Sequence, residues 1–235
     1  MRSLVAALAT LTALTVATGA LADDVAAGDE AAGTEDAPPA QETVDQARTD
    51  YLEGVEHIKR HQWGEALDSF ERAAALKPHA VTTYNIASCH RAMGRYTRAR
   101  AYFREALARN EGQPGELPET LASESRRYLE EIEGLLAHVT VRLAPADALI
   151  AVDGAPLSRV SAKDGMASAV AGVLPSGAGT AVPGGRSELT LDPGAHVFLV
   201  SLKGFNSAAV NRTLAAGAHE SLSVALDRLP AVLHI

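Results

Sequence analysis

The sequence has a single cysteine and fewer basic than acidic residues, and each shortage excludes a class of protein. Cys89 is the only cysteine among 235 residues, so neither an intrachain disulfide nor a metal site built from several cysteines is possible. Lys and Arg number 21 against 29 Asp and Glu, which gives a net charge of −8. Proteins that bind duplex nucleic acid usually carry a basic domain or stripe, so this function is not expected.

Motifs of common enzymes and cofactor sites are also missing. The sequence contains no G-x-S-x-G motif, no P-loop and no dinucleotide-binding glycine pattern. His57 and His61 have a spacing that can hold a metal, but they do not form the H-E-x-x-H motif. Cys89 and His90 are adjacent, and adjacent side chains on a helix do not face each other. The sequence therefore predicts no catalytic centre, no cofactor and no bound metal.

The first 22 residues have the pattern of a secretory signal peptide. Arg2 precedes an uncharged run from Leu4 to Val16, and Ala20-Leu21-Ala22 provides an A-x-A ending. A retained membrane anchor is the alternative, but the apolar run is shorter than the roughly 20 residues that a spanning helix needs. We therefore expect cleavage after residue 22, an exported mature protein and no membrane-spanning segment after cleavage.

Residues 23–46 differ in composition from the rest of the chain. They contain eight acidic residues, no Lys or Arg, and the pair Pro38-Pro39. Too few apolar side chains are present to offset the entropy cost of ordering this segment. The sequence predicts a disordered acidic linker, which serves either as a spacer or as an acidic arm for a basic partner.

An apolar pattern then repeats at a spacing of 33 residues. Trp63, Ala66, Phe70 and Ala73 recur as Tyr96, Ala99, Phe103 and Ala106. Each copy places apolar residues on one face of a helix, and a preceding helix is expected at residues 47–61 and 80–93. Gly54 and Ala87, again 33 residues apart, put a small residue where the paired helices would cross. Residues 117–137 show a further amphipathic pattern, which predicts a helix that caps the second pair.

These motifs resemble the tetratricopeptide repeat over residues 47–110. The resemblance rests on Tyr51, Gly54, Trp63, Ala66, Phe70, Ala73 and Pro78 in the first copy, and on Tyr84, Ala87, Gly94, Tyr96, Ala99, Phe103 and Ala106 in the second. It implies helical hairpins whose first helices line a concave face that binds a segment of another protein. Carried onto this sequence, the implied protein-binding residues are Tyr51, Val55, Ile58, Tyr84, Asn85, Ser88 and Arg91.

The second copy is rich in arginine. Six arginines occur within 19 residues, namely Arg91, Arg95, Arg98, Arg100, Arg104 and Arg109. Some of them are four residues apart and therefore share a helix face. Two interpretations follow: a solvated helix surface, or a patch that binds the carboxylates of an acidic peptide or polymer.

From residue 138 onward the apolar residues follow a different period. Val139, Val141 and Leu143 alternate with polar residues, which predicts a strand with one buried face. Turn pairs such as Asp153-Gly154 and Lys203-Gly204 recur between short apolar runs. This pattern is typical of a small antiparallel β-sandwich, here over residues 138–228.

The same region resembles the PEGA domain family. The resemblance rests on Val152-Asp153-Gly154, Leu191-Asp192-Pro193-Gly194-Ala195-His196, Gly204-Phe205 and Ala216-Gly217. Residues 157–186 depart from the family pattern as an Ala/Gly/Ser-rich insertion, which we expect to form a flexible loop. Helical repeats followed by such a module resemble envelope proteins of myxobacteria and related bacteria. Residues 229–235 form an apolar tail.

The sequence as a whole predicts an α+β fold with two domains. Tetratricopeptide-like hairpins with a capping helix occupy residues 47–137, and a small antiparallel β-sandwich follows. The expected function is a non-catalytic scaffold or adaptor that binds a protein or peptide partner through its helical repeats. It would act in the periplasm or at the surface of a Gram-negative-type bacterium. The alternative is a module that binds cell-wall or surface polysaccharide through the PEGA-like domain.

Overall fold

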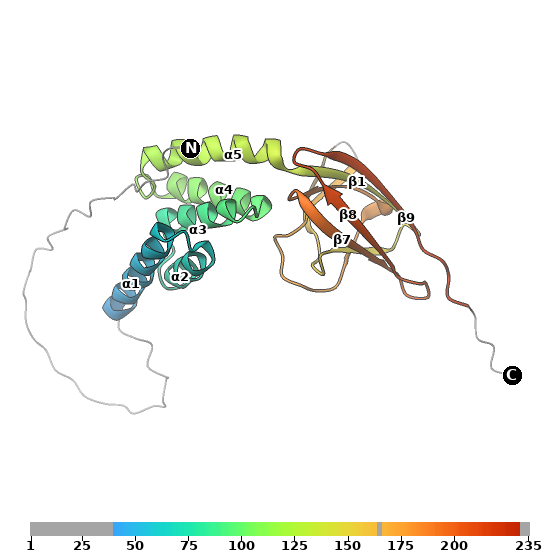
Figure 1. Ribbon diagram of the computed structural model, residues 1–235, viewed down its shortest axis with the longest axis horizontal. Coiled ribbons are helices and arrows are strands. Elements are labelled where there is room, and N and C mark those ends of the chain that lie inside the picture. Colours follow the sequence, from blue (N-terminus) through green and yellow to red (C-terminus); the bar gives the residue numbers. More distant parts are fainter. Residues whose placement is uncertain (1–39, 164–165, 231–235) are drawn as a thin grey trace, which may run out of the picture. The chain divides into compact units, whose positions relative to one another are not determined.

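The computed structural model describes residues 40–163 and 166–230, which belong to one compact unit (Figure 1). Helices come first along the chain and strands follow, so the predicted α+β fold is confirmed. The predicted signal peptide, most of the predicted acidic linker and the last five residues of the apolar tail lie outside the described residues.

Five helices form the first part of the described chain: α1 (Ala40–Lys59), α2 (Trp63–Leu76), α3 (Ala80–Ala92), α4 (Tyr96–Gly112) and α5 (Glu119–Leu135). α1 pairs with α2, α3 pairs with α4, and α5 packs against the second pair. None of these described helices has the length and apolar character needed to cross a bilayer.

α1 begins earlier than expected. Its first turns include residues 40–46, which the composition assigned to the disordered linker. Ala47 is buried in the hairpin, and Gln46 Nε2 donates a hydrogen bond to Asp50 Oδ1 at 3.3 Å on the same helix. Since residues 40–46 contain no glycine or proline, the helix extends backward from the packed region without a break. The linker prediction is therefore wrong for these seven residues.

Each hairpin is built around one buried phenylalanine. Phe70 lies against Gly54, where an added Cβ would lie 2.7 Å from the ring, so only glycine leaves room for this contact. Phe103 occupies the matching place in the second hairpin and contacts the rings of Tyr84 and Tyr128, with centroid distances of 5.7 and 5.4 Å. The spacing of 33 residues thus corresponds to two similar packing units.

The break between the two hairpins follows from Pro78. The ring of a proline excludes the helical conformation for the residue before it, and Lys77 is extended with φ −144° and ψ 93°. The next helix, α3, begins two residues after the proline, at Ala80. His79 Nδ1 accepts a hydrogen bond from the Val81 N–H at 3.2 Å and caps the first turn of α3.

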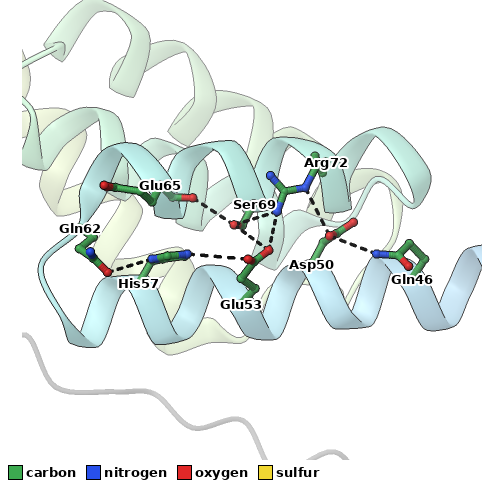
Figure 2. Close-up of polar contacts among 8 residues, drawn as sticks. All are labelled: Gln46, Asp50, Glu53, His57, Gln62, Glu65, Ser69 and Arg72. Atoms are coloured by element: carbon green, nitrogen blue, oxygen red, sulfur yellow. Dashed lines mark hydrogen bonds and ion pairs between the residues drawn. The ribbon is translucent and has the colours of Figure 1, made fainter.

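A polar network joins α1 to α2, as Figure 2 shows. Its members are Gln46, Asp50, Glu53, His57, Gln62, Glu65, Ser69 and Arg72, and we call them the α1–α2 polar network. Arg72 forms ion pairs with Asp50 and Glu53 across the two helices. Ser69 Oγ lies 3.2 Å from Glu53 Oε2 and 3.0 Å from the backbone carbonyl oxygen of Glu65, and its one hydroxyl proton is donated to either acceptor. The first hairpin is therefore held by polar contacts as well as by its apolar core.

Nine strands form the second part of the described chain: β1 (Ala137–Ala144), β2 (Leu149–Val152), β3 (Ser158–Lys163), β4 (Met166–Val170), β5 (Thr180–Ala181), β6 (Arg186–Leu191), β7 (Gly194–Ser201), β8 (Ala208–Leu214) and β9 (His219–Ala225). One sheet has the order β3-β4-β6-β1-β9 and the other β5-β2-β7-β8. Side chains from both sheets, including Val141, Ile150, Leu189, Phe198 and Leu222, share one buried core. This part of the chain is a β-sandwich.

The Ala/Gly/Ser-rich segment 157–186 differs from expectation, because it contributes strands to both sheets. β3 and β4 pair with each other, and β4 also pairs with β6. Ser187 Oγ donates to the Ala167 carbonyl at 2.7 Å, and Ala169 is buried in the core. Small side chains have a low preference for strands, so a strand here is hard to predict from the sequence. Backbone hydrogen bonds between β4 and β6 hold the segment as part of the sheet. The expectation of a flexible loop is not met for these strands.

The larger sheet is mixed rather than purely antiparallel. β1 runs parallel to β9, and β4 runs parallel to β6, whereas β1 and β6 are antiparallel. Alternation of apolar residues shows which face of a strand is buried but carries no information on the direction of its neighbour. The antiparallel expectation was therefore incomplete.

Candidate protein-binding face

The seven predicted protein-binding residues lie on α1 and α3, the first helices of the two hairpins. Tyr51 and Asn85 are in direct contact, since Asn85 Nδ2 donates to Tyr51 Oη at 3.2 Å. Both side chains are half-buried. Burial raises the pKa of the Tyr51 hydroxyl and outweighs the bond from Asn85, which lowers it, so the hydroxyl stays protonated. This contact joins the two helices at the centre of the predicted site.

Tyr84 differs from the expectation, because it belongs to the core. Its side chain is only 9% exposed and packs edge-on against Phe103. The hydroxyl donates to Glu124 Oε2 at 2.7 Å, and Tyr128 donates to the other oxygen of that carboxylate at 2.6 Å. Burial, followed by the bond to Glu124, raises the pKa of Tyr84. Tyr84 therefore holds α3 against α5 and is not presented to a partner.

Arg91 is also held by contacts with α5. One guanidinium nitrogen, Nη2, donates to both carboxylate oxygens of Glu131 at 2.7 and 2.9 Å. The guanidinium carbon lies 4.0 Å from the centre of the Tyr128 ring, which adds a cation–π contact. Arg91 Nε is buried without a hydrogen-bond partner among the described residues. A side chain committed in this way contributes little to capture of another protein.

The other predicted residues remain accessible. Val55 and Ile58 are half-buried and pack on the core of the first hairpin. Ser88 is also half-buried, and its hydroxyl donates to the Tyr84 carbonyl at 2.9 Å. We call the accessible residues the α1–α3 face; they are Tyr51, Val55, Ile58, Asn85 and Ser88. This face offers aliphatic contact beside amide and hydroxyl groups, a combination suited to a polypeptide.

The residues of α5 that contact Tyr84 and Arg91 were not predicted from the sequence. Glu124, Tyr128 and Glu131 follow the spacing i, i+4, i+7 and so lie on one side of the helix. All three lie within the amphipathic pattern of residues 117–137, which predicted a capping helix but not carboxylate partners for α3. The spacing alone could have suggested them. Leu52, which is 53% exposed, is another apolar residue on α1 that was not among the predicted ones.

The arginines of the second hairpin are mostly paired within the molecule. Arg100 and Arg104 both contact Glu133, and Arg109 pairs with Glu105 on its own helix. Arg98 donates through Nε to the Gly172 carbonyl at 2.6 Å. These contacts favour the interpretation as a helix surface over that of a patch reserved for an acidic polymer.

Cys89 and His90 do not form a reactive pair. Cys89 is fully buried, and burial raises the pKa of its thiol to about 12, so the nucleophilic thiolate is not formed near neutral pH. His90 is 1% exposed and stacks on Tyr102 with a centroid distance of 5.4 Å. Burial, together with Arg98 and Arg95, lowers the pKa of His90 to about 4. Both side chains are therefore neutral parts of the core.

A serine, a glutamate and a histidine also meet in the α1–α2 polar network, but in the wrong order for catalysis. Glu53 lies between the other two: Ser69 donates to it, and His57 Nε2 is 3.9 Å from its other oxygen. Nucleophilic catalysis requires the histidine to accept the serine proton directly. His57 Nδ1 instead contacts Gln62 Oε1 at 3.0 Å. This arrangement can hold helices together but cannot activate a hydroxyl.

The predicted histidine pair is separated by a turn. His57 belongs to α1, whereas His61 lies beyond its end with φ +58° and its ring beside Trp63. Within residues 40–163 and 166–230, no three His, Cys, Asp or Glu side chains are grouped closely enough to hold a metal ion.

Comparison with known proteins supports the repeat. Residues 82–112 match the family model described as tetratricopeptide repeat, which covers the second hairpin. Among curated proteins, none matches this sequence.

Two solved structures are among those that match part of this chain. One is PcrH in complex with the chaperone binding region of PopD, with 25% identity and a TM-score of 0.34 over 37% of this chain. The match spans 64% of that chain, so under two thirds of its length. The other is the Arabidopsis OM64 TPR domain, with 16% identity and a TM-score of 0.32 over 39% of this chain and 77% of that one. Within the α+β fold, the similarity to the tetratricopeptide repeat is carried by residues 82–112 of the helical part.

Proposed function

We propose that this protein is a non-catalytic adaptor that binds a segment of another protein on the α1–α3 face. The observation that carries the proposal is the clustering of half-buried side chains on the first helices of two repeat-type hairpins. Tetratricopeptide repeats are interaction modules, and residues 82–112 match their model. The buried, neutral state of Cys89 and His90 supports the same conclusion, because it removes the most reactive pair from consideration.

The chemistry of the α1–α3 face suits an extended or helical segment with apolar side chains. Val55 and Ile58 provide aliphatic surface, and burying each apolar side chain of a partner contributes about 1.5–3 kcal/mol. Asn85 donates through Nδ2 to Tyr51, which holds the carboxamide in place. Its Oδ1 has no hydrogen-bond partner among the described residues and can accept a backbone N–H of the partner. With only two hairpins the face is short, so a modest affinity is expected.

We further propose that the protein acts outside the cytoplasm, in the periplasm or at the cell surface. The support comes from the signal-peptide pattern of residues 1–22, which lies outside the described residues. The test is the mass of the protein recovered from its native source. A mature amino terminus at residue 23 is the expected result, and an intact Met1 in the cytoplasmic fraction would contradict it.

The binding proposal is tested with the full mature chain as bait in an envelope extract. Val55→Glu places a charge on the aliphatic surface, and Asn85→Ala removes the carboxamide together with its hydrogen bond to Tyr51. Ala75→Glu, at an exposed position of α2 outside the face, is the matched control. We expect each face variant to reduce capture of the retained protein at least tenfold while the control captures as much as the wild type. Equal capture by Val55→Glu and the wild type would contradict the proposal.

The same experiment addresses the polysaccharide alternative. The retained material is assayed for wall and surface polymer as well as for protein. Retention of polymer that is indifferent to Val55→Glu and Asn85→Ala, with no retained protein, would replace the adaptor proposal by a polymer-binding role for residues 138–228.

A further inference from the structure

The amino-terminal end of α4 is capped by a residue from the β-sandwich. The residue that precedes the helix, Arg95, makes no side-chain cap. Instead Asp192 Oδ1 accepts the Thr97 N–H at 2.6 Å, and Oδ2 accepts the Thr97 hydroxyl at 3.2 Å. Asp192 directly follows β6, 95 positions further along the chain. Caps normally come from the residue beside the helix, so this one ties two distant segments together.

The electrostatics of this cap favour the contact. A carboxylate at the first turn of a helix faces unpaired N–H groups and the positive end of the helix dipole. Thr97 is 1% exposed, so water does not compete for its N–H. Burial raises the pKa of Asp192, whereas its bonds to Thr97 and Tyr96 lower it. Arg98 adds a second bond in the same region, because its Nε donates to the Gly172 carbonyl.

The carboxyl-terminal end of α5 is capped from the β-sandwich as well. The Gly217 N–H, in the turn between β8 and β9, donates to the Leu135 carbonyl at 3.1 Å. This carbonyl is one of those that a helix leaves unpaired at its last turn. Gly217 has φ +68°, and an added Cβ would lie 3.0 Å from the Gly134 carbonyl oxygen. A glycine is therefore required both by the backbone conformation and by the close approach to α5.

We propose that the β-sandwich is a two-point helix cap that fixes itself to the helical part in solution and ends the helical array. One point is the Asp192 carboxylate on the amino-terminal end of α4, and the other is the Gly217 amide on the carboxyl-terminal end of α5. Two separate points resist rotation, which a single covalent connection between α5 and β1 would allow. This role goes beyond partner binding and does not depend on it.

Nuclear magnetic resonance of the full chain tests the proposal without any substitution. A coupling across the hydrogen bond between the Thr97 nitrogen and the Asp192 carboxyl carbon is expected. Residues 40–135 and 138–230 should report one rotational correlation time. Absence of the coupling together with two distinct correlation times would overturn the proposal.

Two variants and two matched controls complete the test. Asp192→Ala removes the first cap, and Asp147→Ala, at an exposed turn position, is its control. Gly217→Ala disturbs the second cap, and Gly204→Ala, with a similar positive φ but open space around it, is its control. We expect hydrogen exchange at the Thr97 amide to be at least tenfold faster in Asp192→Ala and unchanged in Asp147→Ala. The double variant Asp192→Ala, Gly217→Ala should show two correlation times, and one shared time in that variant would contradict the proposal.

Discussion

The two helical hairpins share their small and aromatic positions but are stabilised differently. Gly54, Phe70 and Ala73 in the first correspond to Ala87, Phe103 and Ala106 in the second. Other matching positions have opposite character. Glu53 corresponds to the buried Ile86, and Ser69 corresponds to Tyr102. The first hairpin therefore has a polar network where the second has apolar contacts.

Location in the array explains this difference. The second hairpin lies between α2 and α5, and both helices contact it. No described helix precedes α1, so part of its surface faces solvent. There Arg72 forms its ion pairs with Asp50 and Glu53 while remaining half exposed. The comparison shows that a repeat can keep its spacing and its phenylalanine while its other contacts adapt to its neighbours. The family model match, residues 82–112, falls in the second copy.

The largest effect should come from the phenylalanines, and it should differ between the hairpins. Both side chains are fully buried, so replacing either Phe70 or Phe103 by alanine should lower the free energy of unfolding by about 3–5 kcal/mol. We expect Phe103→Ala to be the more damaging, because both Tyr84 and Tyr128 lose a ring contact. Urea denaturation of the two variants measures this. A larger loss for Phe70→Ala would show that the first hairpin is the more dependent on its core.

Buried histidine should make the second hairpin sensitive to acid. The pKa of His90 is lowered to about 4 in the folded state, against an ordinary value of 6.5, so the unfolded chain takes up the proton first as the pH falls. Stability is fully present above pH 6.5 and decreases toward pH 4, by about 3 kcal/mol. His90→Phe preserves the stacking on Tyr102 and should flatten this dependence. Parallel pH profiles for the variant and the wild type, from thermal unfolding, would argue against this origin.

The crossing position tests how closely the helices approach in each hairpin. Gly54→Ala places a Cβ 2.7 Å from Phe70, so the free energy of unfolding should fall by about 1–3 kcal/mol through overpacking. Ala87→Gly, at the matching position, should cost about 1 kcal/mol through lower helix propensity. Thermal unfolding of both variants measures these two losses of stability. A neutral Gly54→Ala variant would show that the ring of Phe70 can move away and that close approach of α1 does not require glycine at this position.

The smallest effect should come from the α1–α2 polar network. Arg72→Met removes ion pairs in which Arg72 and Glu53 are half exposed and Asp50 is buried, so a loss of about 0.5–1 kcal/mol is expected. High salt should reduce the difference between the variant and the wild type, because screening weakens the wild-type pairs. Glu105→Gln, at the matching position on α4, provides the comparison in the second hairpin. A salt-independent loss would indicate that the aliphatic stem of Arg72 stabilises the hairpin by packing.

The helical part could be predicted from the sequence because its signals are local. The spacing of Ala66, Phe70 and Ala73, and the proline at position 78, depend on neighbours within a few residues. The binding face was predicted only in part. Tyr84 and Arg91 have the right register, but their exposure depends on carboxylates 40 residues further along the chain.

The pairing of the strands was harder to predict for the same reason. The alternation of apolar residues in β1 shows that one face of the strand is buried. It gives no information on a parallel neighbour as distant in sequence as β9. The segment 157–186 has small side chains whose strand character depends on pairing with β6. A composition rule therefore could not identify β3 and β4.

The parallel pairing of β1 with β9 also has a consequence for the order of events during synthesis. A ribosome extends the chain from its amino terminus, so each helical hairpin can close as soon as its second helix emerges. β1 cannot complete its pairing at that stage, because His138 pairs with His219 and the register continues to Ala144 with Ala225. Until those residues have been translated, one edge of β1 is unpaired and open to other nascent chains. Ribosomes stalled before residue 219 should therefore carry folded hairpins beside an unfinished sandwich.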